Sequence, residues 1–242
     1  MNKTKESYDG SYRKTSILVG ALFIIGTVSG VLSVVFAGNL LSDPDYLIKL
    51  AENQNQILIS SLCVLIMGMS LAMMSVMLFP ILKKYNEALA LGAVVLRGAL
   101  EAVLYIAIVI SWFLLLTVSQ EYVKAGALDA SYFQTLGTLA LKASDQIGSI
   151  LDIVFSLGAL MIYYLFYQSR LIPRWLAVWG LIGAMLYLSS GLFAVFSLDF
   201  GVLEAPLALQ EMVMAVWLIV KGFDISPIIG NVESVQVAIS HA

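Results

Sequence analysis

The chain has 242 residues, of which 60% are hydrophobic and only 12% are charged, and its mean hydropathy is +0.93. Soluble domains are roughly 45–50% apolar and about 25% charged, and a soluble fold of this size cannot hide so many apolar side chains. A net charge of −3 without a basic stripe gives nucleic acid nothing to bind. Composition therefore excludes a soluble enzyme, a disordered chain and a nucleic-acid binder, and it predicts a protein of the lipid bilayer.

Six apolar segments are each long enough for a membrane-crossing helix, which takes about 20 residues. We expect all of them to be helical, because a segment in lipid must satisfy its own backbone hydrogen bonds. The first is longer than a signal-peptide core and has no clear cleavage site after it, so we expect it to be retained. The predicted spans are Ile17–Ala37, Ile57–Leu82, Ala88–Val118, Gln146–Tyr167, Trp175–Ser197 and Leu203–Val220.

The prediction is thus an all-α integral membrane bundle of six transmembrane helices over residues 17–221. Residues 1–16 and 222–242 form an N-terminal segment and a C-terminal tail. Basic residues concentrate on the cytoplasmic side of membrane proteins, and most of those in this chain fall on the side of the N-terminus. We therefore expect both termini to be cytoplasmic. The basic residues on that side are Lys3, Lys5, Arg13, Lys14, Lys83, Lys84, Arg170, Arg174 and Lys221.

Two outer loops carry signals for short surface helices. In the first, the run from Ser42 to Asp45 combines capping residues with a proline, and apolar residues then fall near one face. In the second, Asp129 can cap a helix that leads into the fourth span, with a bend near Gly148. One long continuous helix is the alternative for the second loop, and the sequence does not distinguish the two.

Ionisable residues inside the spans are the strongest functional signal, because each costs about 2.5–3.5 kcal/mol to insert. With a rise of about 1.5 Å per residue, Arg97 and Glu211 both lie about 15 Å from the inner boundary. Glu101 follows Arg97 by one helical turn on the same face. These three side chains are expected to form a cluster, whereas Asp152 lies nearer the outer surface.

Two interpretations of the cluster stay open. In the structural one, Arg97 locks the third span to the sixth without adding much stability. In the functional one, the cluster lines a cavity for an ion, a proton or an anionic group. Two carboxylates share one guanidinium, so we expect one of them to carry a proton if the site is dry.

Polar and small residues recur at helical spacing along several spans. Asp152, Ser156 and Tyr163 share one face of the fourth span, and Tyr105 extends the face of Arg97 and Glu101, so opposed faces would give the bundle a polar interior. Gly26 and Gly30 in the first span allow a close helix approach, within the chain or in a homodimer.

The residues needed for common catalytic and metal sites are missing from the sequence. The single histidine, His241, is the penultimate residue, and the single cysteine, Cys63, lies in an apolar run. This excludes histidine-ligated intramembrane metal sites and Ser-His-Asp catalysis. We expect no metal and no cofactor, and the sequence leans against enzymatic activity.

Two segments carry a resemblance to a known family. They are Leu171-Ile-Pro-Arg-Trp-Leu-Ala-Val-Trp-Gly-Leu-Ile-Gly-Ala184 and Leu209-Gln-Glu-Met-Val-Met-Ala-Val-Trp-Leu-Ile-Val-Lys-Gly-Phe223. With them, the chain from about residue 15 to residue 223 resembles the bacterial domain-of-unknown-function 4386 family. The resemblance implies a multi-pass protein of the bacterial cell membrane, and it implies no activity or site residues.

Three hypotheses on function follow. The first is a non-enzymatic binder, sensor or transporter of a small anionic or proton-linked solute or a lipid head group. The second is a structural or regulatory membrane subunit whose charged cluster only locks the bundle. The third is a metal-independent intramembrane enzyme that acts on a lipid. A cavity that reaches the cluster would favour the first, and a dry, closed cluster the second.

Overall fold

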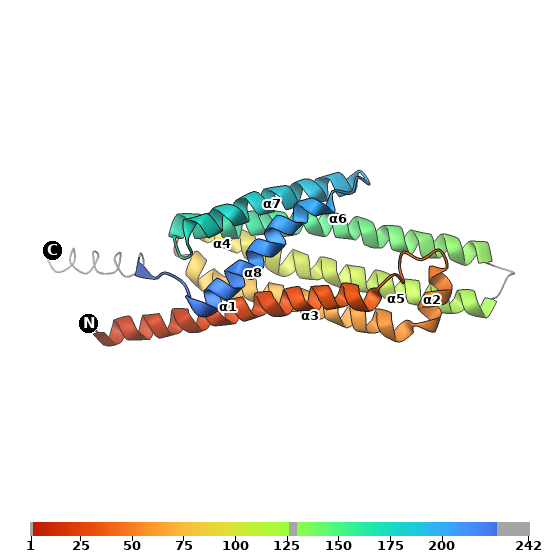
Figure 1. Cartoon of the computed structure of the whole chain (residues 1–242), viewed down its shortest axis with the longest axis horizontal. Coiled ribbons are helices and arrows are strands. Elements are labelled where there is room, and N and C mark those ends of the chain that lie inside the picture. The colour runs from red at the N-terminus through yellow and green to blue at the C-terminus, as the bar shows by residue number, and fades with distance from the viewer. Residues whose placement is uncertain (1, 126–129, 227–242) are drawn as a thin grey trace.

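The computed structural model describes residues 2–125 and 130–226, which form a bundle of long helices (Figure 1). Six helical stretches in these ranges are long and apolar enough to cross a membrane. The predicted all-α class with six membrane helices is therefore confirmed. In chain order the elements are α1 (Asn2–Ala37), α2 (Tyr46–Glu52), α3 (Gln54–Leu82), α4 (Glu87–Ala93), η1 (Val94–Leu100), α5 (Glu101–Ala125), α6 (Ala130–Ser169), α7 (Arg174–Val195), η3 (Gly201–Glu204) and α8 (Ala205–Val220).

The first helix starts well before the first predicted span and is anchored to the last helix. The guanidinium of Arg13 donates to the carbonyl oxygens of Leu218 at 3.3 Å and Ile219 at 2.7 Å. These carbonyls belong to the last turn of α8, where no later helical amide donates to them. A cation at this position donates the missing hydrogen bonds and interacts favourably with the negative end of the helix dipole. α1 begins and α8 ends at the same end of the bundle (Figure 1).

The third span is one continuous rod with an irregular centre. α4, η1 and α5 follow one another without a break, and together they extend beyond the predicted Ala88–Val118. The η1 segment is a π-helix, in which the backbone amide of Glu101 donates to the carbonyl of Leu96. Wider turns of this kind occur mostly as short insertions in α-helices, often at functional sites.

The two connections that the sequence analysis predicted to be outer loops differ from each other. The first contains α2, and Asp43 in the preceding loop accepts from the amide of Asp45 at 2.9 Å and pairs with Lys49. The fourth span has the continuous form, because α6 runs unbroken through Gly148. The proposed capping residue Asp129 lies outside the described residues, as does the tail from residue 227 onward with His241.

Glycines set the closest helix approaches. A Cβ on Gly26 would lie 3.0 Å from Leu71, and one on Gly30 would lie 2.7 Å from the sulfur of Met67, so both glycines face α3. The Gly26–Gly30 face therefore packs within the chain, and a second copy of the chain would need another surface. A Cβ on Gly180 of α7 would lie 2.4 Å from the ring of Tyr163 on α6.

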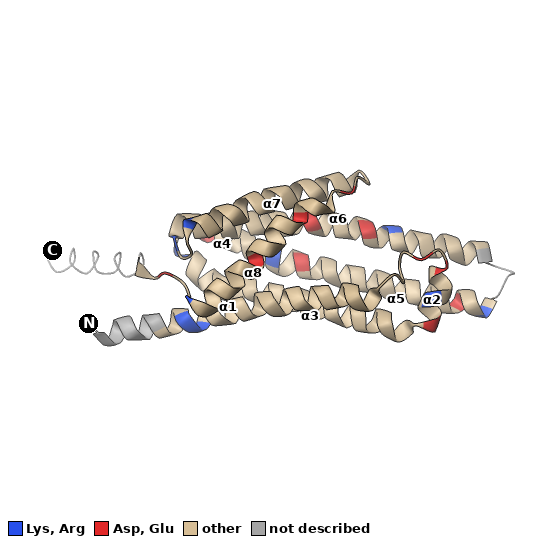
Figure 2. Ribbon diagram, in the orientation of Figure 1, with Lys and Arg blue, Asp and Glu red and all other residues tan. Residues whose placement is uncertain are grey.

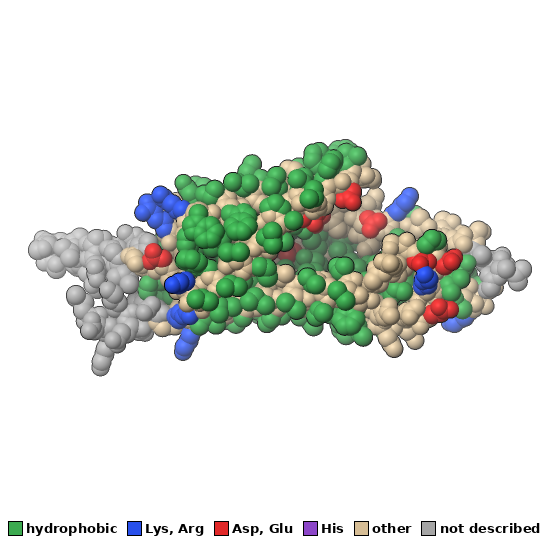
Figure 3. Space-filling model, viewed as in Figure 1, with side chains coloured by type: hydrophobic (Ala, Val, Ile, Leu, Met, Phe, Trp, Pro, Cys, Tyr) green, Lys and Arg blue, Asp and Glu red, His purple; other side chains and the backbone are tan. Residues whose placement is uncertain are grey.

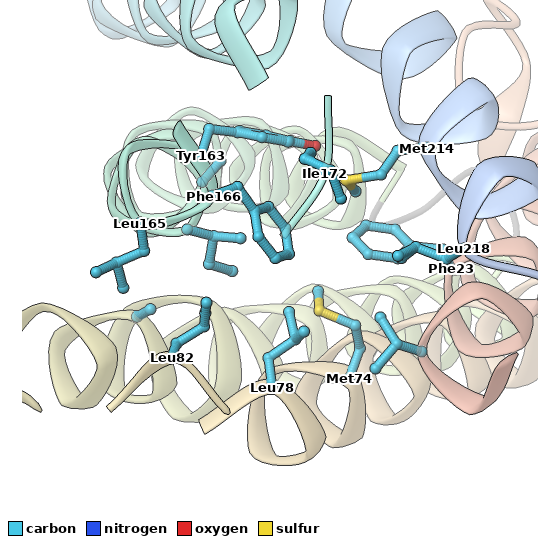
Figure 4. Close-up of a cluster of buried hydrophobic side chains, with 14 of the residues drawn as sticks. Phe23, Met74, Leu78, Leu82, Tyr163, Leu165, Phe166, Ile172, Met214 and Leu218 are labelled. Carbon is cyan, nitrogen blue, oxygen red and sulfur yellow. The ribbon is translucent and has the colours of Figure 1, made fainter. Parts of the chain in front are cut away.

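The main hydrophobic core lies where α1, α3, α6 and α8 converge. Figure 4 shows Phe23, Met74, Phe166 and Met214 directed toward this core from four different helices. The outside of the bundle is also apolar, and Figure 3 shows hydrophobic side chains over most of its middle. Such a surface suits contact with lipid.

Candidate functional site: a buried ion cluster

The structure brings together the three charged residues deepest in the spans. Nη2 of Arg97 lies 2.6 Å from Oε1 of Glu211, and Nη1 lies 3.6 Å from Oε2 of Glu101. Arg97 comes from η1, Glu101 opens α5 one turn later, and Glu211 comes from α8. The cluster thus joins the third span to the sixth, as expected from their common depth.

The cluster is sealed on most sides. Arg97 is 1% exposed, Glu101 0% and Glu211 8%. The guanidinium carbon of Arg97 lies 4.0 Å from the ring centroid of Phe155, a close cation–π contact. A Cβ on Gly158 would lie 2.9 Å from the backbone nitrogen of Arg97, so glycine is what allows α6 to close over it.

The two carboxylates are bound unequally. Glu211 accepts a short hydrogen bond from Arg97, whereas no described residue donates a hydrogen bond to either oxygen of Glu101. The other guanidinium nitrogen, Nη1, likewise has no hydrogen-bond partner among the described residues. One positive charge therefore faces two negative ones in the buried interior, where an unbalanced charge is costly.

Two tyrosines and a glutamine complete the surroundings of the cluster. Tyr105 and Tyr163 are close enough to Arg97 to interact with its charge. Tyr163 is 1% exposed. Gln210, which precedes Glu211, is fully buried and donates to the carbonyl of Leu176 at 3.0 Å. The sequence analysis did not single out Gln210, although a glutamine beside a buried glutamate in an apolar span was a usable signal.

Asp152 belongs to a second polar cluster. Its side chain interacts with the hydroxyl of Tyr187 and with the carboxylate of Glu204, while Ser190 donates to Glu204 at 2.9 Å. Ser156 instead donates to the carbonyl of Asp152 within its own helix, at 2.6 Å. Glu204 was missed because its position at the start of the sixth span is typical of a headgroup-level residue.

An aromatic pair connects the two clusters. The ring of Phe155 contacts Arg97 on one side, and its centroid lies 4.7 Å from that of Tyr187. Glu101, Glu211 and Asp152 come from three different helices, and Figure 2 shows acidic positions of α5, α6 and α8 near one another in the middle of the bundle.

The polar interior is open toward one face. Tyr105, Asp152, Tyr187 and Glu204 all keep part of their surface accessible, in contrast to Arg97 and Glu101 beneath them. Figure 3 shows this face hollowed beside the outer half of α8, with acidic side chains inside the hollow. A small solute could thus approach the ion cluster past two further carboxylates.

Comparison with known proteins gives a family and no activity. No curated protein and no solved structure shows significant similarity to the chain. The model of one family, described as a domain of unknown function (DUF4386), matches residues 18–222. This match runs from within α1 to just beyond the end of α8, and so includes at least part of each of the six membrane-spanning helices. The chain therefore belongs to the DUF4386 family.

Proposed function

We propose that this chain is a non-enzymatic protein of the bacterial cell membrane, with both termini cytoplasmic, in which binding of a small solute is coupled to the release of a proton. The observation that carries the proposal is the carboxylate of Glu101, which is fully buried without a hydrogen-bond donor among the described residues. The hollow toward the cluster supports a role in transport or sensing.

The charge balance favours a proton over an anion as the bound species. Glu211 already neutralises Arg97 through the 2.6 Å contact, so the second carboxylate leaves one excess negative charge. A proton shared between Glu101 and Glu211 makes the cluster neutral, and a solute that displaces this proton gives proton-linked binding. Among the solutes that the sequence left open, an anion is disfavoured. The hollow that leads to the cluster carries two more carboxylates, those of Asp152 and Glu204, which repel it.

Infrared difference spectroscopy across neutral pH tests the proposal on the full chain in lipid vesicles. The wild type is expected to show the C=O band of a protonated, buried carboxyl group that titrates, and Glu101→Gln is expected to remove it. Glu121→Gln is the matched control, because Glu121 lies on the same helix but is half exposed and paired with Lys124 at 2.7 Å. A wild-type spectrum without such a band, or the same band in Glu101→Gln, would overturn the proposal.

A structural lock is the second candidate function, favoured by the burial and short length of the Arg97–Glu211 contact. On this alternative, Glu211→Gln loosens the bundle while no carboxyl group titrates near neutral pH. The same spectra, recorded with a thermal unfolding curve for each variant, therefore separate the two functions.

A further inference from the structure

A pocket lies at the end of the bundle where α6 turns into α7 and α8 ends. Its volume is about 420 Å³, and its lining includes Arg170, Pro173, Arg174, Trp217 and Lys221. The two sequence segments that carry the family resemblance, around residues 171–184 and 209–223, converge here. The ion cluster does not use any of these residues, so the pocket needs its own explanation.

The pocket is positively charged, and its basic side chains are free to contact a ligand. Arg170, Arg174 and Lys221 are exposed, and within the described ranges none of them forms an ion pair with a carboxylate. Asp224 is the acidic residue in the lining, and its Oδ1 accepts from the amide of Ser226 at 3.0 Å. Three positive charges against one negative favour an anionic ligand.

The local backbone holds these cations in place. Arg170 directly follows the end of α6 and has a φ of 59°, which costs a residue with a side chain about 1–2 kcal/mol. Its amide donates to the carbonyl of Phe166 at 3.0 Å, and the amide of Asp224 donates to the carbonyl of Leu171 at 2.9 Å. The chain after α8 is thereby fixed against the α6–α7 turn.

Aromatic rings lie in the pocket, where Trp217 lines it, and beside it. Trp175 is 54% exposed and packs edge-on against Trp217, with 6.4 Å between ring centroids. The guanidinium carbon of Arg174 lies 5.4 Å from the ring centroid of Tyr167. Tryptophan and tyrosine gather at the level of lipid head groups, and Figure 3 shows basic side chains at this end, next to the hydrophobic surface.

We propose that this pocket binds the head group of an anionic phospholipid, with the phosphate held by Arg170, Arg174 and Lys221 and an acyl chain along Trp175 and Trp217. The predicted cytoplasmic side is where anionic lipids meet basic pockets between membrane helices. A free anion would satisfy the cations but would leave the exposed side of Trp175 uncovered. This inference does not depend on the proton-linked function of the ion cluster.

Native mass spectrometry of the full chain in detergent tests this site, with phosphatidylglycerol as the probe and phosphatidylcholine as the neutral comparison. The wild type is expected to retain one phosphatidylglycerol in preference to phosphatidylcholine. Each basic residue near an anionic lipid contributes about a five-fold gain in affinity. The double variant Arg174→Gln/Lys221→Gln should therefore bind about 25-fold more weakly, whereas Lys14→Gln should bind as wild type does.

Three outcomes would overturn the inference. They are equal retention of both lipids by the wild type, wild-type affinity in the double variant, and displacement of the lipid by millimolar inorganic phosphate, which would identify a free anion as the ligand. A circular dichroism spectrum checks that the double variant is folded. If it is not, the single variants Arg174→Gln and Lys221→Gln are compared with Lys14→Gln instead.

Discussion

Neutralising each member of the ion cluster in turn should produce three very different losses of stability. Arg97→Met removes the positive charge that both carboxylates face, and removing one partner of a buried ion pair costs about 3–5 kcal/mol. The methionine fills much of the space beside Phe155, so the loss reflects charge rather than a cavity. Arg97→Met is therefore expected to be the most destabilising of the three variants.

The two carboxylates should differ because their distances to Arg97 differ. Glu211→Gln weakens a charge-assisted hydrogen bond of 2.6 Å, which is worth about 1.5–3 kcal/mol. Glu101 lies 3.6 Å from its nearest guanidinium nitrogen, too far for a good hydrogen bond, and it supplies the excess negative charge. We therefore expect the free energy of unfolding of Glu101→Gln to be within about 0.5 kcal/mol of the wild-type value, or higher than it.

Reversible unfolding in mixed micelles, followed by tryptophan fluorescence, measures these free energies. The expected order of loss is Arg97→Met, then Glu211→Gln, then Glu101→Gln. Glu121→Gln serves again as the control and should match the wild type. If Glu101→Gln costs as much as Glu211→Gln, the two carboxylates hold Arg97 equally and the reasoning from charge excess is refuted.

Three further predictions concern the ends and the first outer loop. Gly222 has a φ of +79° and meets Arg13 where a Cβ would stand, so Gly222→Ala should lower the free energy of unfolding by about 1–2 kcal/mol, and Gly222→Asn by less. Arg13→Gln removes the cation at the end of α8 and should cost about 1–2 kcal/mol in the same assay, with Lys14→Gln unchanged. The hydrogen bond from Lys49, helped by the amide of Asp45, lowers the pKa of Asp43. The stabilisation of the loop by the Asp43–Lys49 pair is thus fully present above the ordinary pKa of 3.8. It is lost as the pH falls through the lowered pKa of Asp43 in the folded protein. NMR titration should show the pKa of Asp43 rising in Lys49→Met, and an unchanged pKa would contradict the pairing.

The parts of the fold that follow from length and hydropathy were predictable. A membrane imposes a fixed thickness, so counting residues from the boundaries placed Arg97 and Glu211 at one level, where the structure joins them. The same reasoning needs no knowledge of helix order around the bundle, because charged residues in the membrane usually pair with one another.

The finer features depend on contacts between distant segments and left no local signal. The stacking of Phe155 on Arg97 and the close approach at Gly158 come from helix packing, and an aromatic or a glycine in an apolar span is unremarkable by itself. The π-helical turn at Val94–Leu100 contains Gly98, but a single glycine in an apolar span does not distinguish a π-helical turn from an α-helical one. Glu204 required knowledge of how α8 lies against α7.

The π-helical turn contains one residue more than an α-helical turn would, and it lies at the depth of the charged residues of the third span. Each residue of an α-helix turns the chain by about 100°. If η1 tightened to α-helical winding, α5 would rotate by about a quarter of a turn relative to α4. Glu101 and Tyr105 would swing together, and Arg97, which lies within η1, would turn relative to Glu211. Rotation of the span could thus replace the side chains that face the hollow by others, without any movement of a loop.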